Sequence, residues 1–328
     1  MTKPVLYLAL ALIALSSCSE KQTPKLYATI AGIEVDDFVY TNNGYLLIFS
    51  NYDNDESNFT LLLKSENQDA VAQPVFPISR RDTLFASNLI YALIEKEGES
   101  WLLFDKTADK KSNQKKYKLS KHDFLRRATE KSYTILPIIG RDLSNAKDLQ
   151  IDEKRGVMIY FDKERNDFVA INLKDGTFKS FLFPQKTLNP VVTSLTGITQ
   201  PKTDTATFKL VLNKNNATLY LINLQNGELY SVHENYLIGK QFFSKDIQTQ
   251  IILVESGLDN VVDIEFDERN RPIIATDKSI YLIRNNDKAV ILNNFKYGDI
   301  SSISYSNGKI FFNAKTKKNN IFYIELTK

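Results

Sequence analysis

The stretch VVDIEFDERNRPIIATD, residues 261–277, predicts two short β-strands joined by a turn. Residues 261–267 alternate apolar and polar side chains, the pattern of a strand with one face in a core. Residues 268–270 are all polar and form the turn, after which an apolar run continues as the second strand. Two more strands follow at residues 279–284 and 288–292. Four strands in about 32 residues is the size of one propeller blade.

The same order of strands and turns recurs along the chain. The best internal match pairs INLKDG, residues 171–176, with INLQNG, residues 222–227. Each motif places a glycine between two strands, where a tight hairpin requires a positive φ angle. The repeat therefore predicts an all-β chain built from four-stranded antiparallel units.

Counting these units predicts a β-propeller of six blades, with about 48 residues in each. Seven or eight blades are the alternative if the long connections contain more strands. The last unit, from about Asp299, offers three strands, and residues 26–31 can supply the fourth. Pairing the N- and C-terminal strands would close the ring and cover an exposed sheet edge.

Two connections are longer than the others. Residues 120–146 include Ser120-Lys121-His122-Asp123, which matches a helix start, and we expect one short helix there. Residues 234–258 include a β-like run at 250–254 that predicts an additional strand.

The stretch 261–277 resembles the inner-strand pattern of β-propellers of the NHL and six-bladed TolB-like groups. It differs from them at Asn270, which stands where glycine is usual in the turn. The resemblance implies a propeller over some 290 residues. It does not imply a function, because one fold hosts many functions.

The N-terminus has the pattern of a targeting segment. Lys3 is followed by an apolar run from Val5 to Leu15, which is shorter than the about 20 residues that a membrane-spanning helix needs. Leu15-Ser16-Ser17-Cys18 resembles the lipobox of bacterial lipoproteins, and Cys18 is the only cysteine of the chain. The resemblance implies cleavage between Ser17 and Cys18, with a diacylglycerol and an N-acyl chain on the new N-terminal residue. An ordinary secretory signal cleaved near Ser17 or Ser19 is the alternative.

These features divide the chain into three parts. Residues 1–17 are a predicted lipoprotein signal peptide, residues 18–24 a lipidated linker, and residues 25–328 a single β-propeller domain. Residue 19 is serine rather than aspartate. By resemblance to the lipoprotein sorting rule, this predicts the outer membrane of a bacterial cell envelope, facing the periplasm.

The composition excludes several classes of function. Lysine and arginine number 42 and aspartate and glutamate 39, a formal net charge of +3. Such a balance gives no basic face for a nucleic acid. With one cysteine the chain has no internal disulfide and no thiolate metal site.

The candidate site residues are carboxylates near the starts of the predicted inner strands. They can face the central channel together: Asp36, Asp37, Asp148, Asp263 and Asp299. The two histidines, His122 and His233, fall in positions typical of surface residues, and no G-x-S-x-G motif supports a serine nucleophile.

The sequence therefore favours a non-enzymatic role over an enzyme. We expect a lipid-anchored envelope propeller that binds a protein or glycan partner and needs no cofactor beyond its covalent lipid. The alternative is a calcium-dependent hydrolase or lyase that uses the channel carboxylates.

Overall fold

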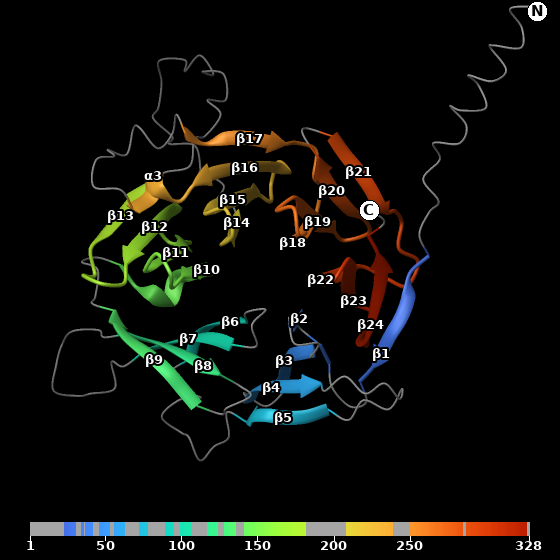
Figure 1. Ribbon diagram of the computed structural model, residues 1–328, viewed down its shortest axis with the longest axis horizontal. Coiled ribbons are helices and arrows are strands. Elements are labelled where there is room, and N and C mark those ends of the chain that lie inside the picture. Colours follow the sequence, from blue (N-terminus) through green and yellow to red (C-terminus); the bar gives the residue numbers. More distant parts are fainter. Residues whose placement is uncertain are drawn as a thin grey trace, which may run out of the picture.

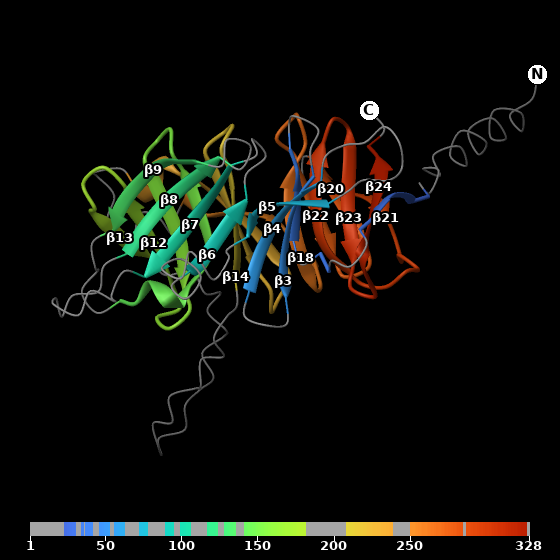
Figure 2. The same ribbon diagram turned by 90° about the horizontal axis from the view of Figure 1, so that it is seen from below.

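The computed structural model shows an all-β protein (Figure 1). The structure describes residues 23–30, 34–35, 37–41, 46–52, 56–62, 72–77, 89–94, 99–105, 117–123, 128–135, 141–181, 208–238, 250–284 and 287–326. These residues form six four-stranded antiparallel sheets around a common centre, and Figure 2 shows the sheets side by side in a disk. The predicted all-β class with four-stranded antiparallel sheets is confirmed.

Five of the sheets are each built from four consecutive strands. The first two sheets contain β2 (Asp37–Tyr40), β3 (Leu46–Tyr52), β4 (Glu56–Leu62) and β5 (Ala72–Pro77), then β6 (Leu89–Ile94), β7 (Glu99–Asp105), β8 (Tyr117–Asp123) and β9 (Ala128–Ile135). The third contains β10 (Ala146–Asp152), β11 (Val157–Asp162), β12 (Asp167–Asn172) and β13 (Phe178–Phe181). The fourth and fifth contain β14 (Phe208–Asn213), β15 (Thr218–Asn223), β16 (Glu228–His233) and β17 (Ile252–Glu255), then β18 (Val261–Phe266), β19 (Pro272–Thr276), β20 (Ile280–Arg284) and β21 (Asp287–Leu292).

The sixth sheet joins the two ends of the described chain. It contains β22 (Ile300–Ser306), β23 (Lys309–Ala314) and β24 (Lys317–Glu325), with β1 (Lys25–Thr29) paired antiparallel to β24. The ring of Tyr27 lies 5.1 Å from that of Phe311 and 5.9 Å from that of Tyr40, centroid to centroid. One aromatic side chain of β1 therefore contacts both the last sheet and the first.

The hydrophobic core lies between neighbouring sheets. Phe161 and Phe168 of the third sheet pack against Phe208 of the fourth, with ring centroids 5.4 Å and 5.3 Å from the Phe208 ring. Similar buried clusters join the second sheet to the third and the fifth to the sixth. Burying one such side chain stabilises the fold by roughly 2 to 3 kcal/mol, so packing between sheets supplies the stability expected of a chain without disulfides.

The two matching motifs of the sequence form equivalent turns. In the third sheet Gly176 has a φ of 70°, and its N–H donates to the carbonyl of Asn172 at 2.8 Å. In the fourth sheet Gly227 has a φ of 63°, and its N–H donates to the carbonyl of Asn223 at 2.9 Å. A Cβ atom at Gly227 would also lie 2.7 Å from the backbone of Leu258, so this position requires glycine.

Asn270 lies in the turn where the propeller groups that this stretch resembles usually have glycine. Its φ is 60°, in the left-handed region that asparagine tolerates better than most residues. The side chain of Asp267 accepts hydrogen bonds from the backbone N–H groups of Arg269 and Arg271 at 2.9 and 2.8 Å. The departure from the usual glycine is therefore compatible with the same kind of tight turn.

The helix predicted in the connection 120–146 is wrong at its expected start. Ser120 to Asp123 belong to β8, which pairs with β7 on one side and β9 on the other. Pairing on both sides satisfies the backbone of this segment, so the tertiary context overrides its resemblance to a helix cap. The structure instead has a short 3-10 turn at Leu143–Asn145.

The second long connection contains the predicted additional strand, since β17 is the fourth strand of its sheet. It also contains a short helix, α3 (Asn235–Ile238). Among the described residues no helix combines the length and apolar character needed to cross a membrane.

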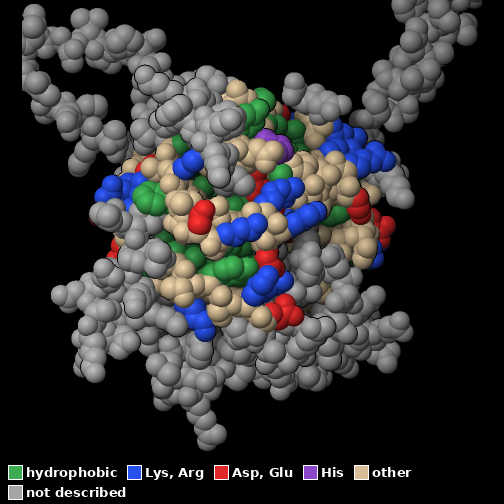
Figure 3. Space-filling model, turned by 60° about the vertical axis from the view of Figure 1, so that its left-hand side comes forward, with side chains coloured by type: hydrophobic (Ala, Val, Ile, Leu, Met, Phe, Trp, Pro, Cys, Tyr) green, Lys and Arg blue, Asp and Glu red, His purple; other side chains and the backbone are tan. Residues whose placement is uncertain are grey.

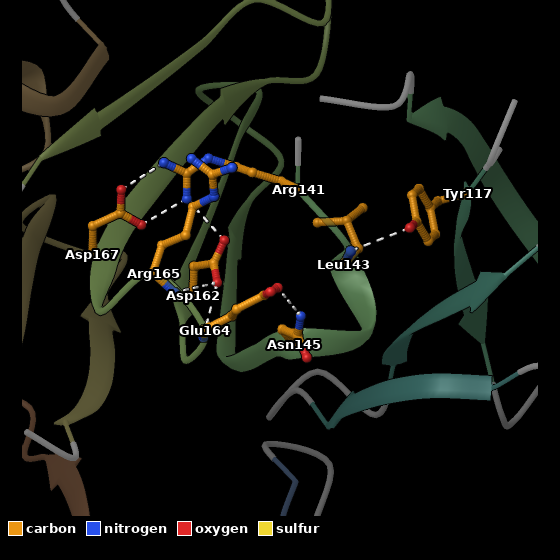
Figure 4. A network of polar contacts seen from close by, with 8 residues as sticks. All are labelled: Tyr117, Arg141, Leu143, Asn145, Asp162, Glu164, Arg165 and Asp167. Carbon is orange, nitrogen blue, oxygen red and sulfur yellow. Dashed lines mark hydrogen bonds and ion pairs between the residues drawn. The ribbon is translucent and has the colours of Figure 1, made fainter. Parts of the chain in front are cut away.

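A buried ion-pair network joins the segment before β10 to the β11–β12 turn of the third sheet (Figure 4). Arg141 donates to Asp162 at 2.8 Å and to both carboxylate oxygens of Asp167 at 2.6 and 2.5 Å. Asp162 also accepts the backbone N–H groups of Glu164 and Arg165 in the β11–β12 turn. The charge of Arg141 is compensated by Asp162 and Asp167, which indicates a structural role for the network.

Candidate functional site

Charged side chains from four different sheets meet at the centre of the ring. Asp37 lies on β2, Asp148 on β10, Lys209 on β14 and Asp263 on β18, all near the starts of strands that Figure 1 places innermost. Each of the three carboxylates acts electrostatically on the Lys209 ammonium group. Residues of non-neighbouring sheets can interact in this way only where the inner strands converge. We refer to these four residues as the central cluster.

Lys209 is the cation of the central cluster. Its Nζ donates to Asp263 Oδ1 at 2.7 Å and to the carbonyl oxygen of Val262 at 2.6 Å. Burial by itself lowers the pKa of a lysine, but Asp263 first and then Asp148 and Asp37 outweigh it, so the pKa of Lys209 lies above its ordinary value. Lys209 therefore stays charged at neutral pH.

Asp148 and Asp263 also connect neighbouring inner strands. Asp263 Oδ2 accepts the backbone N–H of Ile303 on β22 at 3.0 Å, and Asp148 Oδ2 accepts that of Leu210 on β14 at 3.3 Å. Two further side chains make the same kind of bond: Gln150 accepts from Leu212 N, and Ser304 accepts from Tyr40 N. The carboxylates of Asp148 and Asp263 thus help to hold the inner strands together.

Backbone irregularities aim the acidic side chains at the centre. The pairing of β10 with β11 shifts register between Lys147 and Gln150, and Asp148 within this bulge has a φ of 49°. The pairing of β18 with β19 shifts between Val261 and Asp263. Such β-bulges redirect a side chain away from the regular alternation of the strand.

Asp37 is exposed, whereas the other two acids, Asp148 and Asp263, are half-buried. Its carboxylate accepts a hydrogen bond from the neighbouring N–H of Phe38 at 2.8 Å. Burial among protein atoms and then the charge of Asp263 raise its pKa from 3.8 to about 7, against the opposing effect of Lys209. The side chain is exposed to water yet surrounded by protein, so it can change protonation state near neutral pH.

The other predicted site residues lie elsewhere. Asp299 precedes β22 and its main-chain carbonyl accepts the N–H of Lys315 at 2.7 Å, but no contact in the described part of the chain joins it to Lys209. Asp36, Ser17 and Cys18 are outside the described residues. His122 belongs to β8, and His233 is exposed at the end of β16, where its Nδ1 accepts the N–H of Asn235 at 3.2 Å.

Lys209 is the site residue that sequence reasoning missed. It stands in FKLVLN, second in an inner strand, close to the start as Asp148 and Asp263 are in theirs. A lysine at a centre-facing position of an apolar strand was the available signal. Among the described residues no group of three or more histidine, cysteine, aspartate or glutamate side chains is arranged to hold a metal ion.

In the view of Figure 3 the described surface carries both basic and acidic side chains. Basic side chains lie among acidic, apolar and uncharged ones on the side that is at the left in Figure 1. This distribution agrees with the nearly balanced formal charge of the chain.

Solved structures similar to this chain are propeller-like proteins, whereas no protein-family model and no curated protein sequence matches it. A nidogen/laminin complex aligns with a TM-score of 0.52 and 9% identity, over 86% of this chain and 90% of that one. A structural genomics protein of unknown function from Bacteroides thetaiotaomicron aligns with a TM-score of 0.52 and 11% identity, over 93% and 76%. The extracellular domain of a putative hybrid two component system from the same organism has a TM-score of 0.50 and 11% identity, over 92% of this chain and 39% of that chain. At such identities the likeness shows the fold alone: the chain has a β-propeller-like architecture.

Proposed function

We propose that this protein is a lipid-anchored β-propeller of a bacterial cell envelope that serves as a scaffold for a protein or glycan partner. In this proposal the six sheets are the blades, and the pairing of β1 with β24 closes the ring. The observation that carries the scaffold role is the position of Lys209, whose ammonium group lies among the central carboxylates.

A cation-dependent catalytic centre needs carboxylates that are free to receive the cation. Here the Lys209 ammonium already compensates Asp263, and both Asp148 and Asp263 accept backbone N–H groups of the next sheet. These contacts favour a centre that stabilises the disk. Binding would then take place on the faces, rim or long connections, which a rigid β scaffold presents to partners.

The similar structures support an interaction role without defining the partner. One is a complex of nidogen with laminin, and another is an extracellular domain of a two component system. A protein complex and an extracellular domain are both compatible with an envelope scaffold.

The anchor rests on the sequence Leu15-Ser16-Ser17-Cys18 behind its apolar run. Lipidation of Cys18 by a diacylglycerol and an N-acyl chain would give an effectively permanent attachment, since each buried CH₂ contributes about 0.8 kcal/mol. With Ser19 after the cysteine, we place the protein at the outer membrane, facing the periplasm.

The test is an affinity pull-down from detergent-solubilised envelopes that compares the native chain with Cys18→Ala. The native chain should fractionate with membranes and co-purify with one defined envelope component, while Cys18→Ala should lose the membrane fraction. A native chain that is recovered without any partner would contradict the scaffold role, and unchanged membrane association of Cys18→Ala would contradict the anchor.

One observation favours the second candidate, a calcium-dependent hydrolase or lyase. Asp37 is exposed and has a pKa of about 7, as a general acid or base working near neutral pH would have. Calcium should then raise the melting temperature of the native chain and do so less for Asp37→Asn. Equal melting temperatures with calcium and with a chelator would rule against this candidate.

A further inference from the structure

The sixth sheet carries an exposed patch that combines apolar and basic side chains. Leu26 on β1 is 55% exposed, and Tyr297, in the segment before β22, is 37% exposed. The exposed lysines Lys296 and Lys317 complete the patch. We call these four residues the rim patch, because β1 lies at the outer edge of the ring in Figure 1.

The apolar members of the rim patch meet over one buried side chain. The Tyr297 ring stacks on Phe322, with centroids 5.7 Å apart and an interplanar angle of 6°. Leu26 is the direct cross-strand partner of Phe322 in the β1–β24 pair. Directly paired residues project from the same face of a sheet, so Leu26 and Tyr297 flank Phe322 on one surface.

Both lysines of the rim patch lie against the Tyr297 ring. Lys296 Nζ is 4.9 Å and Lys317 Nζ 5.0 Å from its centroid, within cation–π range. Within the residues that the structure describes, neither lysine forms an ion pair. The patch therefore offers two uncompensated positive charges beside exposed apolar surface.

The loop that carries Tyr297 is held in place by the protein itself. Phe295 is buried between the fifth and sixth sheets, and its N–H donates to the carbonyl of Lys278 at 2.9 Å. Gly298 has a φ of 112°, and a Cβ atom there would collide with the Thr316 side chain. The Thr316 hydroxyl in turn donates to the Tyr297 carbonyl. The rim patch is thus preformed.

The rim patch lies within reach of the proposed anchor. Leu26 follows Cys18 by eight positions in the sequence. Even a fully extended chain of that length spans only about 28 Å. If Cys18 carries lipid, the patch is confined to the immediate neighbourhood of the bilayer surface.

We infer that the rim patch docks against the anionic surface of the membrane in which Cys18 is anchored, and so sets the orientation of the disk. Aromatic side chains prefer the membrane–water interface, and lysines are attracted to anionic headgroups. This inference rests on the proposed lipid anchor. It adds a second contact of the protein with the bilayer, through residues of the folded domain.

The experiment places a fluorescent reporter in the rim patch of the full-length lipidated protein. Tyr297→Trp is reconstituted into phosphatidylcholine vesicles with brominated acyl chains, with or without phosphatidylglycerol. Bromine quenches a tryptophan that enters the interface, whereas the native Trp101 is only 2% exposed and provides a constant background. The matched control is Phe178→Trp on β13, a 44% exposed position across the ring in Figure 1.

Docking predicts that Tyr297→Trp is quenched in vesicles that contain phosphatidylglycerol, and that Phe178→Trp is not. Adding Lys296→Gln or Lys317→Gln to Tyr297→Trp should lower the ratio of docked to undocked protein about fivefold for each lysine, as expected from about 1 kcal/mol per charge. Raising the ionic strength should act in the same direction.

Equal quenching at positions 297 and 178 would overturn the inference, because the disk would then have no preferred orientation. So would an unquenched Tyr297→Trp in protein that still floats with the vesicles, a result that leaves the lipid anchor standing. Protein that fails to float with vesicles contradicts the anchor itself. A blue shift of Tyr297→Trp with a soluble acidic polysaccharide, without quenching in vesicles, would assign the patch to a glycan and overturn the membrane assignment.

Discussion

The ammonium nitrogen of Lys209 lies 2.7 Å from Asp263 Oδ1, and this ion pair joins β14 to β18 at the centre of the ring. The same Asp263 reaches the next sheet through its second oxygen, which accepts the N–H of Ile303. One lysine and one aspartate thus connect three successive inner strands. Electrostatics and backbone hydrogen bonding act together at this point.

Removing the charge of Lys209 should destabilise the protein strongly. In Lys209→Met the half-buried carboxylates of Asp263 and Asp148 lose their compensating cation, and so does the more exposed Asp37. Breaking a buried ion pair on one side typically costs 3 to 5 kcal/mol, and we expect about 3 kcal/mol because Lys209 keeps some contact with solvent. Urea unfolding followed by circular dichroism measures the difference.

The matched control for Lys209 is Lys163→Met, at an exposed position in the β11–β12 turn. It should change the free energy of unfolding by less than about 0.5 kcal/mol. A loss of similar size in both variants would mean that the central position of Lys209 has no special importance.

The protonation of Asp37 should make stability depend on pH. Its pKa of about 7 in the folded protein lies above the ordinary value of 3.8, so the folded state binds the proton more tightly than the unfolded state does. The resulting stabilisation is complete below about pH 4 and is lost as the pH rises to about 7.

Asp37→Asn should therefore be more stable than the native protein at pH 8 and nearly equal to it at pH 4. We expect a gain of about 1 kcal/mol at pH 8, well below the full effect of the shift, because solvent screens this exposed side chain. Unfolding curves at both pH values provide the measurement. If the native protein were the more stable one at pH 8, the direction of the pKa shift would be wrong.

The N-terminal strand should contribute to the stability of the whole domain if it closes the ring. Tyr27→Ala removes ring contacts with Tyr40, Phe311 and Tyr323 and should cost about 3 kcal/mol. Thr29→Ala, at an exposed position of the same strand, should cost much less. A single cooperative transition shifted by Tyr27→Ala would support closure; an unshifted transition would count against it.

The left-handed conformation of Asn270 gives a test of the turn that departs from the usual propeller pattern. Asn270→Gly should stay within about 0.5 kcal/mol of the native stability, because glycine adopts a φ of 60° freely. Asn270→Ala should lose about 1 to 2 kcal/mol from backbone strain, and thermal unfolding compares the two. A loss in Asn270→Gly as large as that in Asn270→Ala would show that the amide contact with Asn215, at 3.1 Å, which both variants lack, outweighs the backbone conformation.

Local patterns predicted the strands and turns well because each depends on neighbouring residues. The alternation at 261–267 forms β18, and both glycine motifs form the expected hairpins. The polar segment Ser120–Asp123 resembles a helix start in the sequence but forms part of β8, because its partners in β7 and β9 lie far from it along the chain.

The sequence by itself determined the class of fold, the repeated four-stranded unit and the acidic residues near the starts of inner strands. Hydrophobic alternation and turn chemistry are local, so they can be read from consecutive residues. Only the tertiary structure decided that Lys209 meets Asp37, Asp148 and Asp263 while Asp299 does not, and that Leu26 lies beside Tyr297. Those relationships arise when strands far apart in the chain converge or pair, and no local pattern encodes which of their side chains then meet.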